Sequence, residues 1–166
     1  MTFLHNYKKD LFVLLKNIIK FCALPWREKG LFTEAFFLTG MVRLLILALP
    51  FRWLAPALGK HMQESPDNED VIRLKAARRI GRIVESVSRF TPWESKCLVQ
   101  AITGKIMLRQ YGIANTLYLG VGKNEQSLVA HSWLRCGKVI LTGGHDLRRF
   151  TVVGKFADDG RQAVRG

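Results

Sequence analysis

The periodicity of apolar residues changes once along this chain, just after Tyr111, and this change constrains the fold more than any other feature. Before it, apolar residues recur at helical spacing; after it, "NTLYLGVG" and the following segments alternate and are rich in strand formers. Helices followed by strands are typical of an α+β fold rather than of alternating βαβ units. With 166 residues, 48% of them apolar, the chain can build a hydrophobic core.

The helical part divides at a polar segment. Amphipathic spacing predicts helices over residues 7–21 and 31–49, the second ended by a proline and followed by a short helical turn. The segment "QESPDNED", residues 63–70, has the composition of a linker. We therefore predict a helical N-terminal extension over residues 1–65 and a main domain over residues 66–166.

Two helices should open the main domain. Asp70 can cap a helix that runs to about Phe90, and a second helix starts near Glu94 and ends at Tyr111, before Gly112. The residues of the first helix that are predicted to face inward are Ile72, Ala76, Ile80, Ile83 and Val87. Its other side is basic, with Arg73, Lys75, Arg78, Arg79, Arg82 and Arg89.

The strands follow as a hairpin and a final strand. "LVAHSWLRC" and "VILTGG" flank Gly137-Lys138, a pair that suits a two-residue β-turn, and "RFTVVGKF" is a last short strand. The expected domain is an antiparallel sheet with the second helix packed on it.

The net charge of +13 is large for a chain of this size. It predicts an anionic partner, which could be nucleic acid, anionic lipid or an acidic peptide, unless the basic surface is simply solvated. The chain lacks a recognisable recognition-helix motif or aromatic stacking platform, so we expect no nucleic-acid partner.

The N-terminal region is hydrophobic but carries charges. Glu34, Arg43 and Arg52 interrupt residues 30–58 and leave uncharged runs short of the ~18 residues that suggest a spanning helix. We therefore expect no membrane span, although these helices could lie on a membrane surface. No signal-peptide pattern is visible, and three cysteines without a regular framework favour the reducing cytoplasm.

The segment "TPWESKCLVQA" places Cys97 at a predicted helix start. Unpaired backbone N–H groups there carry a partial positive charge that favours a thiolate. A thiolate nucleophile needs a base, and His131, on the first arm of the hairpin, is the best placed histidine. No cysteine or histidine has metal-ligand spacing, and we expect neither a metal nor another cofactor.

Strand alternation and register suggest an orienting group for His131. Alternation puts His131 on one strand face with Trp133 and Arg135. If the hairpin turn has two residues, His131 faces Gly144, and Asp146 lies within the diagonal reach of a cross-strand pair. Asp146 could equally be a loop residue that caps a turn.

The remaining candidates have more ordinary explanations. Cys136 sits at the hairpin corner without a helix terminus, and we expect it to be structural. Trp93 and Trp133 are expected first as core residues and second as walls of a substrate groove.

The segment from Pro92 to Phe156 resembles a known family. Its "SKC", "YGIANTLYLGV" and "AHSWL" elements are similar to those of the transglutaminase-like leader peptidases of lasso peptide biosynthesis, the microcin-processing cysteine proteases. "LPWREKGLFTEAFFL" and "RWLAPALG" resemble the helical N-terminal part of such proteins.

The resemblance implies a transglutaminase-like, papain-like core that removes the leader from a ribosomally made precursor peptide. Cys97 matches the nucleophile of the family and His131 its base. The family's acid falls at about residues 141–143, where this chain has no carboxylate. Either Asp146 takes that role or the enzyme works as a Cys–His dyad.

The resemblance also implies partners. The N-terminal part lacks the strands of a fused winged-helix module, so we expect a separate leader-recognition protein, together with a lasso cyclase that acts after cleavage. Two alternatives remain: a non-catalytic peptide-binding scaffold of the same fold, and a basic protein of membrane surfaces or nucleic acids.

Overall fold

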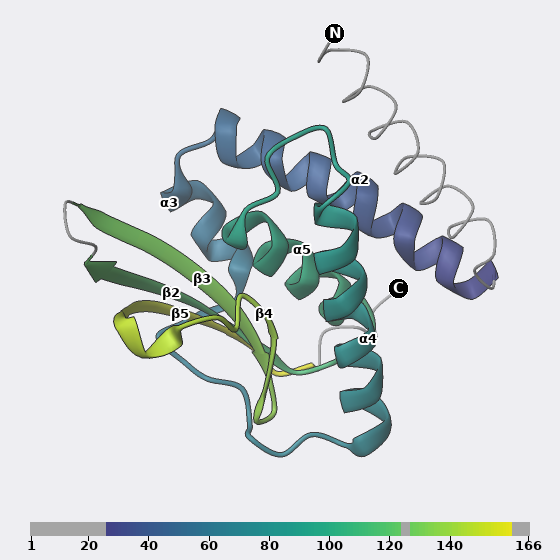
Figure 1. Ribbon diagram of the computed structural model, residues 1–166. Helices are drawn as coiled ribbons and strands as arrows, with labels where there is room; N and C mark the ends of the chain where they lie inside the picture. Colours follow the sequence, from purple (N-terminus) through teal and green to yellow (C-terminus); the bar gives the residue numbers. More distant parts are fainter. Residues whose placement is uncertain (1–25, 124–126, 161–166) are drawn as a thin grey trace, which may run out of the picture.

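A computed structural model describes residues 26–123 and 127–160, and within them helices lie over one face of a sheet (Figure 1). The helix predicted over residues 7–21 lies outside the described residues. The helices are α2 (Trp26–Ala48), α3 (Phe51–Leu54), η1 (Ala55–Leu58), α4 (Val71–Ser88), α5 (Cys97–Gln110) and η2 (Leu147–Arg149). The strands are β1 (Lys60–His61), β2 (Asn115–Lys123), β3 (Leu128–Cys136), β4 (Val139–Thr142) and β5 (Phe150–Asp158).

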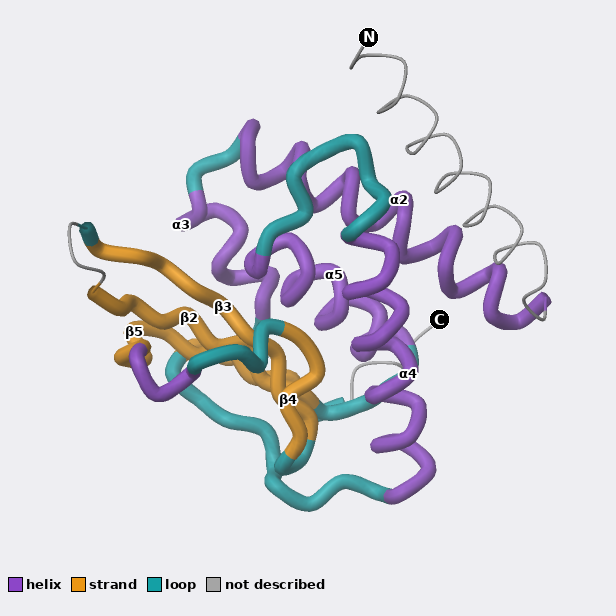
Figure 2. Tube along the Cα trace, in the orientation of Figure 1, coloured by secondary structure: helices purple, strands orange, loops and turns teal. Residues whose placement is uncertain are grey.

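The five strands form one antiparallel sheet in the order β1-β5-β2-β3-β4, which leaves β4 at an edge (Figure 2). Helix α5 packs closely on this sheet, because a Cβ atom at Gly104 would lie 2.8 Å from the Leu134 side chain. The α+β class, with helices first and the second main-domain helix on an antiparallel sheet, is confirmed.

The helix predicted after residue 70 is confirmed with its cap. The Asp70 carboxylate accepts hydrogen bonds from the backbone N–H groups of Ile72 at 2.8 Å and Arg73 at 3.3 Å. The prediction that Ile72 faces inward is wrong: its side chain is 78% exposed, because the first turn of α4 extends past the neighbouring helices (Figure 1). The buried residues of α4 are Ala77, Ile80, Gly81, Ile83, Val84 and Val87.

Helix α2 packs on α4 and α5 through a narrow stripe of small residues. Ala35, Thr39 and Val42 are buried, and Ala35 and Val42 belong to the same hydrophobic core as residues of α4 and α5. Residues 26–48, which we placed in the N-terminal extension, therefore contribute to the core of the main domain.

The expectation that charges exclude a membrane span needs correction. The most apolar 18-residue window within residues 28–48 of α2 has a mean hydropathy of 1.8, and the helix is long and apolar enough to cross a bilayer by length and composition. Glu34 and Arg43 do not prevent this. Core helices of soluble proteins can have the same properties, and α2 makes contacts with α3, α4 and α5.

The segment of residues 63–70, predicted as a linker, is tied to the sheet. The Ser65 backbone N–H donates a 2.8 Å hydrogen bond to the Thr116 hydroxyl. The Arg135 guanidinium donates to the Ser65 carbonyl at 2.9 Å and to the Asp67 carboxylate. The polar residues that suggested a free linker are thus partners of buried groups on β2 and β3.

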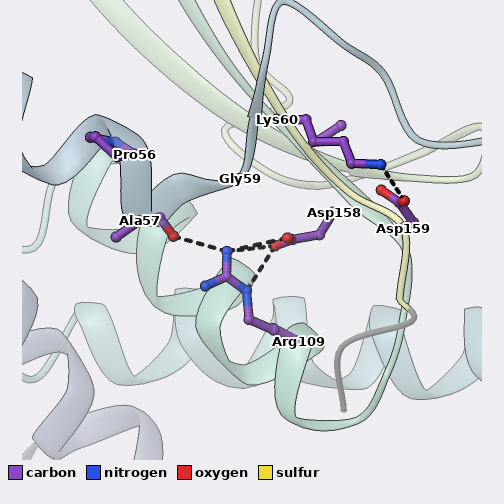
Figure 3. A pocket seen from close by; sticks show the side chains of 8 residues that line it. Pro56, Ala57, Gly59, Lys60, Arg109, Asp158 and Asp159 are labelled. Atoms are coloured by element: carbon purple, nitrogen blue, oxygen red, sulfur yellow. Dashed lines mark hydrogen bonds and ion pairs between the residues drawn. The ribbon is translucent and has the colours of Figure 1, made fainter. Parts of the chain in front are cut away.

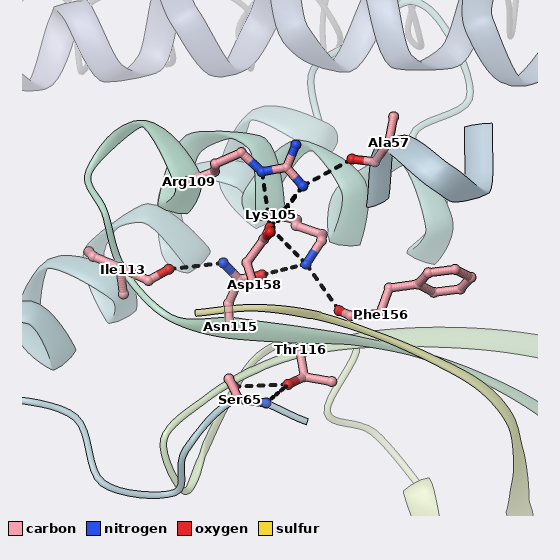
Figure 4. Close-up of polar contacts among 9 residues, drawn as sticks. All are labelled: Ala57, Ser65, Lys105, Arg109, Ile113, Asn115, Thr116, Phe156 and Asp158. Carbon is pink, nitrogen blue, oxygen red and sulfur yellow. Dashed lines mark hydrogen bonds and ion pairs between the residues drawn. The ribbon is translucent and has the colours of Figure 1, made fainter. Parts of the chain in front are cut away.

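A buried ionic network fixes the C-terminal half of α5 (Figure 4). The Lys105 ammonium, 1% exposed, donates to Asn115 Oδ1 and the Phe156 carbonyl, both at 3.0 Å, and pairs with Asp158 at 3.0 Å. The Arg109 guanidinium donates to both oxygens of the same carboxylate, with contacts of 2.9 to 3.2 Å. Burial lowers the pKa of Lys105 from 10.5 to about 8, although the Asp158 charge acts in the opposite direction.

This network also joins α5 to η1. The Arg109 guanidinium donates a 2.9 Å hydrogen bond to the Ala57 carbonyl, across a pocket of about 310 Å³ (Figure 3). Beside it, exposed Lys60 pairs with Asp159 at 2.6 Å. Since these charges already contact one another, the pocket is explained as a structural junction.

Candidate active site

Cys97 is the first residue of α5, close to the predicted helix start. The preceding residue, Lys96, is extended and makes no side-chain capping hydrogen bond, and the first turn contains no acidic residue. The backbone N–H groups of this turn therefore lack a side-chain cap among the described residues, and their partial positive charge acts on whatever lies at the helix end.

The half-buried Cys97 thiol lines a pocket of about 350 Å³ at this end of α5. Ile46 and Leu49 of the α2 end and Phe51 of α3 form one wall. The opposite wall comes from β2, β3 and β5 and includes His131 and Ser132. The pocket is thus mainly apolar, with Cys97, His131 and Ser132 among its lining residues.

His131 is held by a backbone carbonyl and two aromatic rings. Its Nε2 lies 2.8 Å from the Gly143 carbonyl oxygen. Because a carbonyl can only accept, Nε2 is the protonated nitrogen, and Nδ1 of the neutral ring keeps its lone pair. The imidazole stacks on Phe150 at 4.7 Å and lies 6.0 Å from the Trp133 ring.

The His131 imidazole lies on the sheet face away from α5, the helix that begins with Cys97. Leu134 packs on α5, so strand alternation puts Trp133 and His131 on the other face, as their ring contacts show. Among the described residues, no hydrogen bond joins the Cys97 thiol to His131 or to any other group. The structure thus brings the two residues to one pocket without forming the pair.

The register predicted for the hairpin holds only at its turn. Cys136 lies opposite Val139 as expected, but the register then shifts, so that Leu134 faces Thr142, the last residue of β4. His131 consequently has no strand partner on this side, and the pairing expected with Gly144 is not formed. The cause is one extra residue in β4, a bulge that a pattern of apolar residues does not reveal.

Gly143 takes the place next to His131 that a carboxylate was expected to fill. Its φ of +70° lies in the left-handed region, and a Cβ atom would lie 2.4 Å from the Ser132 carbonyl oxygen. Only glycine fits such a close approach, and it is this bend that brings its carbonyl to the imidazole.

Asp146 lies away from His131. Its side chain is 79% exposed and pairs with Arg149 at 3.4 Å, and its own φ is +55°. The described contacts of His131 are made by Gly143, Trp133 and Phe150. The structure therefore places Asp146 in the turn before β5 rather than beside the imidazole.

The two tryptophans that were candidates for substrate binding pack inside the molecule. Trp93 lies 4.9 Å from the Phe36 ring and against Gly40 of α2. Trp133 is 6% exposed and stacks on Tyr118 at 5.3 Å. Neither is among the residues that line the Cys97 pocket, and packing accounts for both.

The two described cysteines differ in environment. Cys136 is fully buried, and burial raises the pKa of its thiol from 9.0 to about 11, with the nearby Glu69 charge acting in the same direction. The neutral thiol is therefore strongly favoured at Cys136, whereas Cys97 reaches a pocket.

Ser132 was missed by the sequence reasoning. It is 2% exposed, lines the Cys97 pocket, and its hydroxyl has no hydrogen-bond partner among the described residues. An unpaired buried hydroxyl costs about 1–3 kcal/mol, and a ligand or water that hydrogen-bonds to it in the pocket would recover this cost. Its place directly after His131 on a strand was the only available signal.

Comparison with known protein families gives a match over most of the chain. The family model for the transglutaminase-like superfamily, Transglut_core3, matches residues 45–155. The chain therefore belongs to the transglutaminase-like superfamily, which includes cysteine peptidases. Comparisons with curated proteins and with solved structures gave no match.

Proposed function

We propose that this protein is a cysteine peptidase that removes the leader from a ribosomally made lasso peptide precursor. The observation that carries the proposal is the position of Cys97: it is the first residue of a helix without a side-chain cap, and it lines a pocket that His131 also lines. The superfamily supports the class of reaction, and the resemblance of the "SKC" and "AHSWL" elements supports the substrate.

In the proposed mechanism, His131 Nδ1 accepts the proton of the Cys97 thiol, and the thiolate attacks the carbonyl carbon at the leader–core junction. The imidazolium then donates its proton to the leaving amine, and water hydrolyses the acyl-enzyme. The transfer requires a distance of about 2.6–3.2 Å or one bridging water. In this structure the imidazole lies on the sheet face away from α5, so the proposed transfer requires the two side chains to move together when substrate binds.

Two groups of this chain would orient the reaction. The Gly143 carbonyl holds the Nε2 proton of His131 and so presents Nδ1, the role that a carboxylate or amide has in related triads. The Cys97 backbone N–H and the free Ser132 hydroxyl are the donors that we assign to the oxyanion. Loss of one such donor typically reduces kcat by about 10²–10³.

Mass spectrometry of a precursor peptide encoded beside this chain, incubated with its recognition protein, tests the proposal. Cys97→Ala should abolish release of the leader while the circular dichroism spectrum stays unchanged, and Cys136→Ala should retain it. Equal release of the leader by both variants would reject Cys97 as the nucleophile. Full activity of His131→Gln would reject His131 as the general base.

A second function, a non-catalytic peptide-binding scaffold, is favoured by one observation: the thiol and the imidazole are not hydrogen-bonded. It predicts that the unmodified chain and Cys97→Ala bind the precursor equally and that neither cleaves it. Stoichiometric formation of a Cys97 thioester on a slow substrate would exclude it.

The proposed partners are the precursor leader, a separate recognition protein and a lasso cyclase, without nucleic acid, in the cytoplasm. We also propose peripheral membrane contact through the exposed apolar residues of α2, among which Phe37, Leu44 and Leu47 are 66–69% exposed. Flotation with anionic liposomes tests this contact; Phe37→Asp/Leu44→Asp should remain at the bottom of the gradient.

A further inference from the structure

A groove of about 890 Å³, larger than the Cys97 pocket, lies between α4 and β4. Its α4 wall carries Lys75, Arg78, Arg79, Arg82 and Glu85, and its other wall comes from residues 139–141 and from Gly144 and His145. A volume of this size is at the upper end of the ~300–1,000 Å³ typical of ligand sites.

The charges on the α4 wall are largely unpaired. Among the described residues, Arg79 pairs with Glu28 at 3.2 Å, but Lys75, Arg78 and Arg82 have no ion-pair partner. Glu85 is the one carboxylate among the described residues of the lining. Three free cations on one helix face give the groove a strong attraction for anions.

The opposite wall and the spacing favour a peptide. Val139, Ile140 and Leu141 are apolar residues of an edge strand, and no aromatic residue for base stacking is among the described lining residues. Arg78 and Arg82 are four residues apart on a helix, about 6 Å along its axis. Side chains at alternate positions of an extended peptide are spaced by roughly 6.6 Å.

The groove also adjoins the candidate active site. Gly144 and His145 line it, and they directly follow Gly143, whose carbonyl accepts the hydrogen bond from His131. A chain lying along α4 would therefore end next to the loop that holds the imidazole.

We propose that this groove binds an extended acidic peptide segment with carboxylates at alternate positions, which face Arg78 and Arg82 while the intervening residues lie on β4. The inference rests on the proposed function for its biological context, as the region of the substrate that is held during cleavage. The binding itself needs no cleavage.

Fluorescence anisotropy with the full chain carrying Cys97→Ala tests binding alone. The probes are a labelled eight-residue peptide of alternating Glu and Thr and its Gln and Thr counterpart, together with an eight-nucleotide single-stranded DNA. The Glu peptide should bind at least about tenfold more tightly than the Gln peptide, and 1 M salt, where the Debye length is about 3 Å, should remove the difference.

A matched pair of variants locates the site. Arg78→Glu/Arg82→Glu should weaken binding of the Glu peptide by about tenfold or more, since two attractive contacts become repulsive. Arg52→Glu/Lys123→Glu, at exposed positions outside the groove, makes the same change in net charge. This control variant should weaken binding of the Glu peptide by less than about threefold.

Three results would overturn the proposal. The first is equal affinity for the Glu and Gln peptides, and the second is an equal loss of Glu-peptide affinity in the two variants. The third is DNA binding that is tighter than Glu-peptide binding and is abolished by Arg78→Glu/Arg82→Glu. If the groove variant fails to fold, the comparison of Glu and Gln peptides on the parent chain and its salt dependence still decide. Acidic peptide binding without precursor cleavage would refute the proposed function alone, and cleavage without such binding would refute this inference alone.

Discussion

The two ends of α5 differ in whether their polar groups are paired. At residues 105–109 every charge has a partner: Lys105 and Arg109 share Asp158, and the surrounding carbonyls accept the remaining hydrogen bonds. At the other end, the Cys97 thiol and the Ser132 hydroxyl have no partner among the described residues and face a pocket.

The difference separates what holds the fold from what is left for a ligand. A saturated buried network stabilises only as long as it stays complete, because each charge depends on the others for its solvation. Unpaired polar groups at a pocket cost stability and are available to a substrate. Substitutions in the network should therefore act mainly on stability, and substitutions at the pocket mainly on reactivity.

The largest effect is expected at the saturated end. Asp158→Ala leaves the Lys105 ammonium buried without its counter-charge, which should reduce the free energy of unfolding by about 3–5 kcal/mol in urea titrations. Asp159→Ala, the adjacent carboxylate, removes only an exposed pair with Lys60 and should cost less than about 1 kcal/mol. Similar losses for the two would show that the buried network does not carry the stability of this region.

Alkylation by iodoacetamide at pH 7 compares a pocket thiol with a buried one. Cys136 is fully buried, and its raised pKa, about 11, leaves only about 10⁻⁴ of it as thiolate at pH 7. Cys97 should therefore react at least about 100-fold faster, as measured by peptide mapping of the native chain. If Cys136 reacts first, the pocket is closed to reagents and cannot admit a peptide bond.

The pH dependence of stability tests the lowered pKa of Lys105. Between pH 8 and 10.5 the unfolded chain keeps the proton on this amine while the folded chain loses it, so the unfolded state binds more protons and stability rises with pH. From pH 7 to 9 the gain should be about 1 kcal/mol. The raised pKa of Cys136 gives the opposite slope only from pH 9 to 11.

Lys105→Met is the matched control for this titration. Its stability should lack the rise between pH 7 and 9, because every other group titrates as in the parent chain. Parallel curves for the two proteins would mean that Lys105 keeps an ordinary pKa in the folded state.

The comparison of the two ends also shows what the sequence could predict. The change from helical to alternating periodicity was enough for the α+β class, and the capping residue Asp70 and the turn at residues 137–138 were placed correctly. Cys97 and His131 were predicted from local signals, a helix start and a strand, and they do line one pocket.

What could not be predicted depends on contacts between distant residues. Lys105 looks like a surface cation of its helix, since its partner Asp158 is far away in the sequence. The burial of Ser132 depends on how α5 lies on the sheet. The bulge in β4 and the close approach of Gly143 to the Ser132 carbonyl depend on how the two strands pair, which alternation alone does not encode.

The smallest effect is expected for Asp146→Asn, which removes the charge of a residue that was predicted to orient His131. Asparagine tolerates the left-handed backbone at φ +55°, so the loop before β5 should keep its shape. The Gly143 carbonyl, a backbone group that this substitution leaves in place, holds the imidazole instead. We therefore expect kcat/KM for precursor cleavage to fall by less than about tenfold, or ~1.4 kcal/mol of barrier.

Gly143→Ala serves as the contrasting variant, because its Cβ would meet the Ser132 carbonyl oxygen at 2.4 Å and displace the carbonyl that orients the ring. If Asp146→Asn instead loses more than about 100-fold in kcat/KM while Gly143→Ala remains active, Asp146 would be the third catalytic residue. Such a result would show that the Asp146 charge acts directly and that the Gly143 carbonyl does not orient the ring.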